Sequence, residues 1–479
     1  MRKAGILLPL SSIPNEFGIG DFGKSSYEFI DHLAEAGIGI WQILPLNPLG
    51  YGNSPYQPFS SYAGDEIYIS LEKLSEYGLL KPSERYEMER TDHILYEEVR
   101  KKKNIYLRLA FSRFEESAEY RAFTENSWVR QYAEYLTCKK KNGMKCWTEW
   151  RGDVVSELGD KDIRYEMFLQ FIFLKQWREL KAYANEKGIL IMGDIPFYVG
   201  LDSLDVWENR ELFKLDEKGY PTVVAGVPPD YFSSLGQRWG NPVYNWEKIR
   251  EDHYRFWLDR IHYNSRMFDM IRLDHFRAFD TYWEIPASCD TAVVGRWVEG
   301  PSYDFFDQLL ETYPDTNIIV EDLGDLRSEV YALRDHFGFK GMKILQFSYD
   351  PKENNNNFPD REELVVYTGT HDNMPVKGWF DTQPEDVQQQ VLENLEKQGI
   401  TEGDIAWRFV VLAFSSVAAI AIVPMQDILG LGEDSRLNVP GELGSPNWEW
   451  KLKDFRAFRE KTGKLRELVK ATGRQKEKV

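Results

Sequence analysis

The segment "MFDMIRLD", residues 267–274, decides the fold of this 479-residue chain. Its apolar side chains fall on both faces of an extended strand, which indicates a strand that is buried on both sides. Side chains alternate along a strand, so Arg272 and Asp274 are expected to point the same way. A charged pair at the end of a buried strand is either a structural ion pair or part of a working site.

Seven further segments share this buried, strand-like character: "GILLPL" (5–10), "GIGIWQILPL" (37–46), "GILIMGDIPFYV" (188–199), "NIIVEDLG" (317–324), "GMKILQF" (341–347), "ELVVYTGTHD" (363–372) and "AAIAIVPMQD" (418–427). Hydrophobic strands that alternate with helical patterns predict a parallel sheet covered on both faces. Eight such units predict an α/β fold, a (β/α)8 TIM barrel formed by residues 1–479 as one domain. About 50 residues follow the eighth segment, too few for a separate C-terminal β-domain.

Two segments interrupt the barrel pattern. Residues 66–160 separate the second and third expected strands and are charged and Tyr-rich, so we expect a helical insertion on a βα loop. Residues 226–246, "GVPPDYFSSLGQRWGNPVYNW", are too rich in Gly, Pro and Asn for regular structure. The second segment is either an Ω-like loop packed by its own aromatic rings or a lid over a cleft.

Polar residues recur where the expected strands end: Asn47, Asp194, Arg272 with Asp274, Glu321, His371 with Asp372, and Asp427. A lone acid at a strand end is usually a cap or a surface carboxylate. A barrel, however, brings the carboxyl ends of its strands together around one pocket, where reactive groups lie. We therefore expect Asp274, Glu321 and Asp372 to meet there.

Three carboxylates in one pocket suit retaining glycoside chemistry. One carboxylate must stay ionised to attack the anomeric carbon, and another must hold a proton for the leaving oxygen. Arg272 is expected to lower the pKa of Asp274, whereas desolvation after the apolar run "NIIV" is expected to raise the pKa of Glu321. Asp372 is then available to bind sugar hydroxyls more tightly in the transition state.

The composition narrows the possible partners. With 77 acidic and 59 basic side chains the net charge is −18, which argues against nucleic acid as the main partner. Three cysteines without a C-x-x-C pair favour a reducing compartment. No signal peptide and no apolar stretch of about 18 residues is present, so we expect a cytoplasmic protein that does not enter a membrane. The histidines show no metal-binding spacing, and we expect neither a metal nor a cofactor.

At the level of motifs the chain resembles a known family. The strings "RLDHF", "VEDLG" and "YTGTHDN" are similar to catalytic segments of the α-amylase clan. Longer strings such as "WQILPLNPLGYGNSPYQPFSSYAGD" and "PMQDILGLGEDSRLNVPG" resemble the 4-α-glucanotransferases of glycoside hydrolase family 77, also called amylomaltases or disproportionating enzymes. The clan usually has a His five residues after Asp194, where this chain has Val199, and the transferase family resembles this chain in lacking it.

The resemblance implies roles for particular residues. It makes Asp274 the nucleophile, Glu321 the acid and base, and Asp372 the stabiliser of the transition state, with Arg272 and His371 beside them. In the 226–246 segment it implies substrate contacts on the acceptor side, at Tyr231, Phe232, Gln237 and Trp239. It implies further sugar contacts at Ser54, Tyr56 and Asn438. Asp194 would have a structural or sugar-contacting role. The implied reaction moves a segment of an α-1,4-glucan to the 4-OH of glucose or of another α-1,4-glucan through a covalent intermediate.

Other functions are open at this point. A hydrolase of the same clan would use the same three acids. "GIGDFG" (18–23) matches the G-x-G-x-x-G pattern of nicotinamide-dependent oxidoreductases, but eight residues separate it from the preceding strand, where that fingerprint needs a tight turn. A non-catalytic glucan-binding protein on an enzyme scaffold is the third alternative.

Overall fold

The core of the molecule is a parallel barrel. The computed structural model describes residues 2–152, 155, 158–229, 233–324, 326–349 and 361–475. Its parallel sheet has the strand order β10-β11-β12-β1-β2-β3-β6-β9. These strands are β1 (Lys3–Leu7), β2 (Ile40–Gln42), β3 (Leu190–Ile195), β6 (Met270–Leu273), β9 (Ile318–Val320), β10 (Gly341–Ile344), β11 (Leu364–Tyr367) and β12 (Ile420–Pro424). A parallel bridge between Ile319 and Lys340 joins the two outer strands, so the sheet curves round on itself.

The sequence prediction of this barrel is confirmed. Each of the eight predicted segments overlaps one of the eight strands, in the same chain order. Strands β6, β11 and β12 are buried at every residue, because helices cover their outer face and other strands' side chains fill the inside. After β12 the described chain continues through helices rather than a further β-domain.

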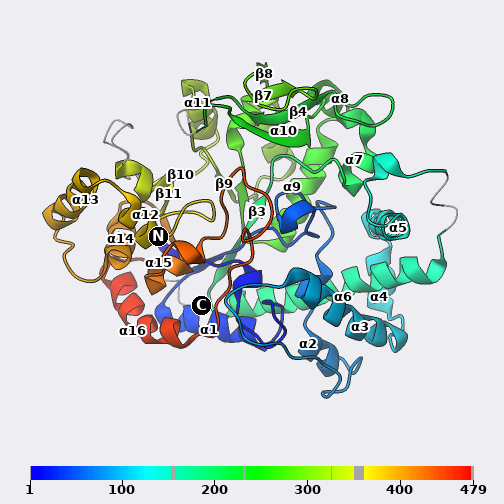
Figure 1. Cartoon of the computed structure of the whole chain (residues 1–479), viewed down its shortest axis with the longest axis horizontal. Helices are drawn as coiled ribbons and strands as arrows, with labels where there is room; N and C mark the ends of the chain where they lie inside the picture. Colours follow the sequence, from blue (N-terminus) through cyan, green and yellow to red (C-terminus); the bar gives the residue numbers. More distant parts are fainter. Residues whose placement is uncertain are drawn as a thin grey trace.

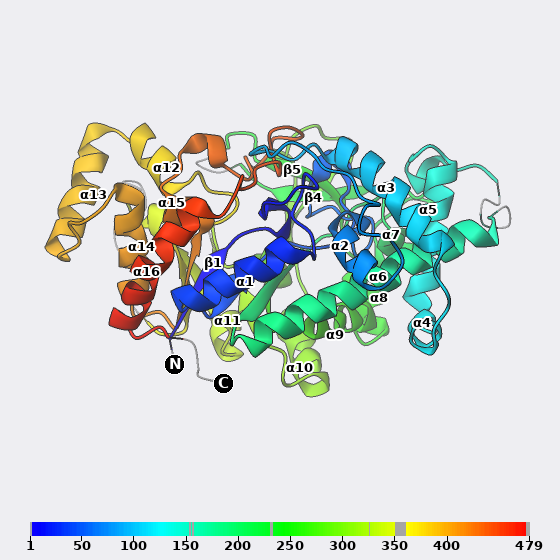
Figure 2. The ribbon, with the colours of Figure 1, turned by 90° about the horizontal axis from the view of Figure 1, so that it is seen from below.

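Helices surround the barrel (Figures 1 and 2). They are α1 (Lys24–Ala36), α6 (Asp160–Glu186), α7 (Leu204–Glu208), α8 (Trp246–Glu251), α9 (Arg255–Met267), α10 (Ser302–Thr312), α11 (Ser328–His336), α12 (Val376–Thr382), α13 (Glu385–Lys397), α14 (Ile405–Ser415), α15 (Met425–Leu429) and α16 (Arg456–Ala471). Helix α1 shows how the sequence sets such a boundary. It buries Phe29, Ile30 and Leu33 at helical spacing and ends at Gly37, whose φ of 75° is a left-handed conformation that glycine adopts without strain.

The long connection between β2 and β3 is largely helical. It contains α2 (Leu71–Glu76), α3 (Tyr96–Ser112), α4 (Ala118–Thr124) and α5 (Ser127–Lys141) before α6 leads into β3. These helices lie to one side of the barrel, next to α6 (Figure 1). We treat residues 66–160 as an insertion within a single domain, which is a proposal about domain organisation.

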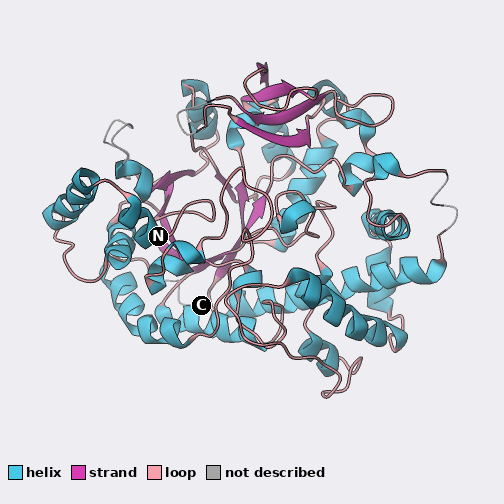
Figure 3. Ribbon diagram, viewed as in Figure 1, coloured by secondary structure: helices cyan, strands magenta, loops and turns pink. Residues whose placement is uncertain are grey.

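A second sheet lies above the barrel in Figure 3, where its strands form a separate magenta group. It is antiparallel, with the order β5-β4-β7-β8, and consists of β4 (Val223–Val227), β5 (Gln237–Pro242), β7 (Thr281–Pro286) and β8 (Arg296–Glu299). The prediction that residues 226–246 lack regular structure is therefore wrong for β5 and for Gly226 and Val227, which end β4. An edge strand such as β5 tolerates Gly and Pro, since only one of its sides needs backbone partners.

The described helices include none that is both long and apolar enough to cross a lipid bilayer.

Candidate active site at the carboxyl end of the barrel

Two of the three predicted acids follow neighbouring strands. Leu273 of β6 pairs with Val320 of β9, so Asp274 and Glu321 each stand one residue beyond that pair. The backbone N–H of Glu321 donates to the carbonyl of Leu273 at 2.9 Å, which fixes the two strand ends against each other. The barrel geometry thus brings Asp274 and Glu321 together, as the sequence predicts.

Glu321 is held by backbone groups. The His275 N–H donates to Glu321 Oε2 at 2.8 Å, and the Leu323 N–H donates to Oε1 at 3.2 Å. These bonds orient the side chain and by themselves favour its ionised form, so the raised pKa described below comes from burial. His275 itself is in the left-handed conformation, with a φ of 50°, directly after Asp274.

Arg272 holds the other carboxylate from below. Its Nη2 lies 3.1 Å from Asp274 Oδ1, while its Nη1 contacts both oxygens of Asp194 at 2.8 and 2.7 Å. Arg272 and Asp194 are buried, whereas the Asp274 side chain is 28% exposed. The charged pair of the opening segment is therefore both structural and part of the site.

Asp372 lies in the loop after β11 and is held at both carboxylate oxygens. His371 Nε2 lies 3.3 Å from Asp372 Oδ2, and Asn438 Nδ2 donates to Oδ1 at 2.7 Å. Arg436 Nη2 donates to the backbone carbonyl of Asp372 at 2.8 Å. Sequence reasoning missed Arg436, for which the only signal was its place in the string "RLNVPG" next to Asn438.

One aromatic side chain links this acid to the other two. The ring of Tyr56 stacks on His371 with centroids 5.1 Å apart, and its hydroxyl donates to Asp194 Oδ2 at 2.8 Å. Unbroken contacts therefore run from Asp372 to Asp274 through His371, Tyr56, Asp194 and Arg272. Three acids that are up to 98 positions apart in the sequence, from 274 to 372, therefore lie together at the carboxyl end of the barrel.

The surroundings of the three acids give them different pKa values. Burial raises the pKa of Glu321 to about 7, against the opposing charge of Arg272, which confirms the sequence expectation. Burial also raises the pKa of Asp274, to about 6. Arg272 lowers this pKa as expected, but burial outweighs its attraction, so the net direction is upward. For Asp372 burial is outweighed by His371 and Asn438, and its pKa falls to about 2. The same pairing raises the pKa of His371 in spite of burial.

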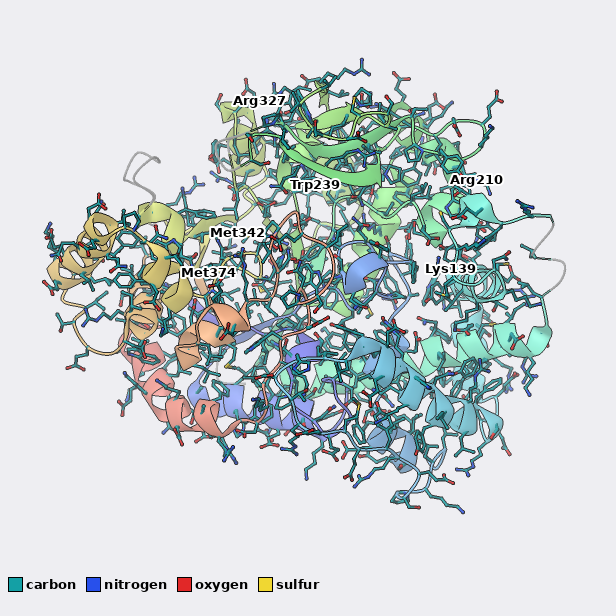
Figure 4. The ribbon with its side chains drawn as sticks, in the orientation of Figure 1. Lys139, Arg210, Trp239, Arg327, Met342 and Met374 are labelled. Atoms are coloured by element: carbon teal, nitrogen blue, oxygen red, sulfur yellow. The ribbon has the colours of Figure 1, made fainter. Side chains whose placement is uncertain are left out.

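Trp239 and Gln237 on β5 lie near His275, the residue whose N–H binds Glu321. The edge of the Trp239 ring meets His275 with centroids 4.9 Å apart, and its Nε1 donates to Gln237 Oε1 at 3.1 Å. Figure 4 shows Trp239 where the second sheet approaches the centre of the molecule. Tyr231 and Phe232 lie outside the described residues.

Two further predicted contacts have structural duties. Ser54 accepts a hydrogen bond from the Tyr56 N–H at 3.3 Å and so shapes the turn that presents Tyr56. Asp194 is buried, and its oxygens contact Arg272 and Tyr56, so it positions these two neighbours. These contacts favour the structural role for Asp194, and its assignment as a substrate-binding residue stays a prediction.

The "GIGDFG" segment has a packing role. Gly18 lies against the side chains of Met88 and Val99, and Gly20 lies against the Leu10 carbonyl, where a side chain would not fit. These glycines are buried and do not form an open phosphate cradle. Among the described residues, no group of three or more His, Cys, Asp or Glu side chains could hold a metal ion.

A (β/α)8 barrel with acids of contrasting pKa at the carboxyl ends of its strands defines a class of carbohydrate-active enzymes that act on glycosidic bonds. The family model described as 4-alpha-glucanotransferase matches residues 8–457. The chain belongs to the 4-α-glucanotransferase family. The prediction of a transferase of this family is confirmed, and the oxidoreductase alternative is not.

Relatives match over the full length. The 4-alpha-glucanotransferase of Thermus thermophilus is 40% identical, with 99% of both chains covered. The chloroplastic/amyloplastic 4-alpha-glucanotransferase of Solanum tuberosum is 39% identical, with 99% of this chain and 86% of that protein covered. The structure of the amylomaltase from Streptococcus agalactiae in complex with acarbose superposes with a TM-score of 0.94 at 34% identity, with 99% of this chain and 100% of that chain covered.

Proposed function

We propose that the chain transfers segments of α-1,4-glucans through a covalent intermediate on Asp274. In the first step the Asp274 carboxylate attacks the anomeric carbon, the glycosidic bond breaks, and Glu321 gives its proton to the departing 4-oxygen. In the second step Glu321 takes the proton of an incoming 4-OH, which displaces Asp274 and re-forms the glycosidic bond. The acceptor is glucose or the non-reducing end of another α-1,4-glucan.

The observation that supports these roles is the contact chain from Asp372 to Asp274. It holds Asp372, whose pKa is lowered, near Asp274, while the pairing of β6 with β9 places Glu321, whose pKa is raised, on the neighbouring strand end. Asp372 stays ionised and is free to bind sugar hydroxyls as the ring flattens toward an oxocarbenium ion. That the related amylomaltase structure contains acarbose is consistent with a carbohydrate in this pocket.

Side chains around the acids are proposed to bind the sugars. Tyr56 and Trp239 offer apolar faces to the C–H surfaces of glucose, and polar groups fix its hydroxyls. The proposed contacts are Arg272, His371, Ser54, Tyr56, Gln237, Trp239 and Asn438, with Tyr231 and Phe232 assigned from the sequence alone. Residues 226–246 are proposed as a lid that excludes water until the acceptor arrives. The odd number of cysteines supports the cytoplasm as the location.

The products from maltotriose test the transferase function. If a glucan 4-OH captures the intermediate, incubation of pure protein with maltotriose is expected to yield longer oligomers together with glucose. Chromatography of the sugars reads this directly. Products that are all shorter than maltotriose would mean that water is the acceptor and that the protein is a hydrolase.

The pH dependence of kcat/KM follows from the two raised pKa values. Asp274 must be ionised, so activity is expected to fall as the pH drops through about 6. Glu321 must be protonated, so activity is expected to fall as the pH rises through about 7. A bell with its maximum between these values is therefore expected, and the two limbs belong to the interacting pair. Initial rates on maltotriose from about pH 4 to about pH 9 check this, and a level profile up to the alkaline end would contradict it.

A further inference from the structure

Asp427 lies beneath the active site and has no part in the chemistry described above. It stands in α15, directly after β12, and its side chain is fully buried. Its Oδ2 accepts a hydrogen bond from Thr368 Oγ1 at 2.5 Å, and its Oδ1 accepts one from the Val376 N–H at 2.7 Å. Burying a carboxylate costs free energy unless it is well hydrogen-bonded, so the two bonds to Asp427 indicate a structural purpose.

The two partners of Asp427 stand at opposite ends of one loop. Thr368 is the first residue after β11, and Val376 is the first residue of α12. His371 and Asp372 lie between them, so a single carboxylate ties down both ends of the segment that carries these two site residues.

The interior of the loop is fixed by separate contacts. Asn373 Oδ1 accepts hydrogen bonds from the Thr370 backbone N–H at 2.8 Å and from its hydroxyl at 2.9 Å. Gln346 Nε2 donates to the carbonyl of Met374, which is labelled in Figure 4, at 2.9 Å. These bonds set the local shape of the loop, while Asp427 sets where the loop sits on the barrel.

We propose that Asp427, with Thr368, is a positioning residue that fixes Asp372 relative to Asp274 by clamping the β11–α12 loop to the end of β12. The inference rests on the proposed role of Asp372. A transition-state stabiliser has to be held within a fraction of an ångström of its productive place. Loss of the Thr368–Asp427 bond is therefore expected to make the position of Asp372 less precise. Because Asp372 acts in the transition state, kcat falls while KM stays nearly unchanged.

The test compares variants that alter one hydroxyl. Thr368→Val removes the bond to Asp427 at nearly equal volume, and Thr368→Ser restores it. Thr462→Val is the matched control, because the Thr462 hydroxyl is also buried but bonds to the Arg459 carbonyl on α16, away from the site. On maltotriose, kcat is expected to fall about 10- to 100-fold in Thr368→Val, with KM within about twofold of the wild type. Thr368→Ser is expected to recover most of the loss, and Thr462→Val to show none.

A double-mutant cycle separates positioning from a general structural effect. If Thr368 acts through Asp372, adding Thr368→Val to Asp372→Asn is expected to change the residual kcat by less than about twofold. The same loss in both backgrounds, or a Thr368→Val enzyme with the kcat of the Thr462→Val control, would overturn the inference. Asp427→Asn changes the other partner of the same hydrogen bond and is a second test of the inference. If Asp427→Asn does not fold, Thr368→Val alone decides.

Failure of the proposed function is distinguishable in the same set. Wild-type turnover in Asp372→Asn would remove the role of Asp372 and the inference with it. An inactive Asp372→Asn beside a fully active Thr368→Val would overturn only the inference.

Discussion

Asparagine in place of Asp274 is expected to lower kcat on maltotriose by at least about 10⁴-fold, which is the scale seen when a catalytic nucleophile is removed. The amide keeps the size of the side chain and can still accept a hydrogen bond from Arg272, so the pocket is expected to keep its shape. It cannot form the ester with the anomeric carbon. Steady-state rates of glucose release measure the effect.

The control for this variant is Asp307→Asn, an exposed acid on α10 that has the same chemistry and no place in the pocket. It is expected to retain wild-type turnover. Turnover within about tenfold of the wild type in Asp274→Asn would refute the nucleophile assignment, because no other residue could replace the lost carboxylate at that rate.

Glutamine in place of Glu321 is expected to have an effect that depends on the leaving group. Its oxygen can still accept from the His275 N–H, but it has no proton to give to a sugar oxygen. Cleavage of maltotriose is therefore expected to fall by about 10²- to 10⁴-fold. A glycosyl fluoride such as maltotriosyl fluoride releases its fluoride without needing a proton, so the first step on that donor is expected to be much less affected.

Fluoride release in a single turnover, measured beside glucose release from maltotriose, tests this difference. Glu329→Gln on α11 is the control, since its side chain is exposed and remote from the acids. An equal loss on both donors would argue against Glu321 as the proton donor. The alkaline limb of the pH profile is also expected to disappear in Glu321→Gln, because that limb reports its deprotonation.

The sequence was sufficient for the barrel because burial on both faces is written into each strand. Residues 364–367 and 418–425 are apolar without interruption, as expected for strands of a parallel sheet that is covered on both sides. It was insufficient for the antiparallel sheet. Strand β5 contains Gly and Pro and is only partly buried, so its sequence lacks the alternation of apolar and polar residues that indicates a strand. Its pairing with β4 could therefore not be predicted.

The acids themselves could be predicted, but not the balance of forces on them. Asp274 follows Arg272 by two residues, which indicates an attractive charge and gives no measure of burial. In the folded chain burial dominates, and the pKa of Asp274 rises to about 6. The contacts of Tyr56 and Arg436 also needed the structure, because their partners are 138 and 64 positions away in the chain.

The measurement that tests the central claim most directly is the capture of the covalent intermediate. Glu321→Gln is incubated with maltotriosyl fluoride, and the reaction is stopped with acid. The protein is then digested, and the masses of its peptides are measured by mass spectrometry. The account predicts a glycosyl adduct on Asp274, because the first step proceeds without an acid while the second lacks its base. An adduct on a different residue, or none at all while fluoride is still released, would contradict it.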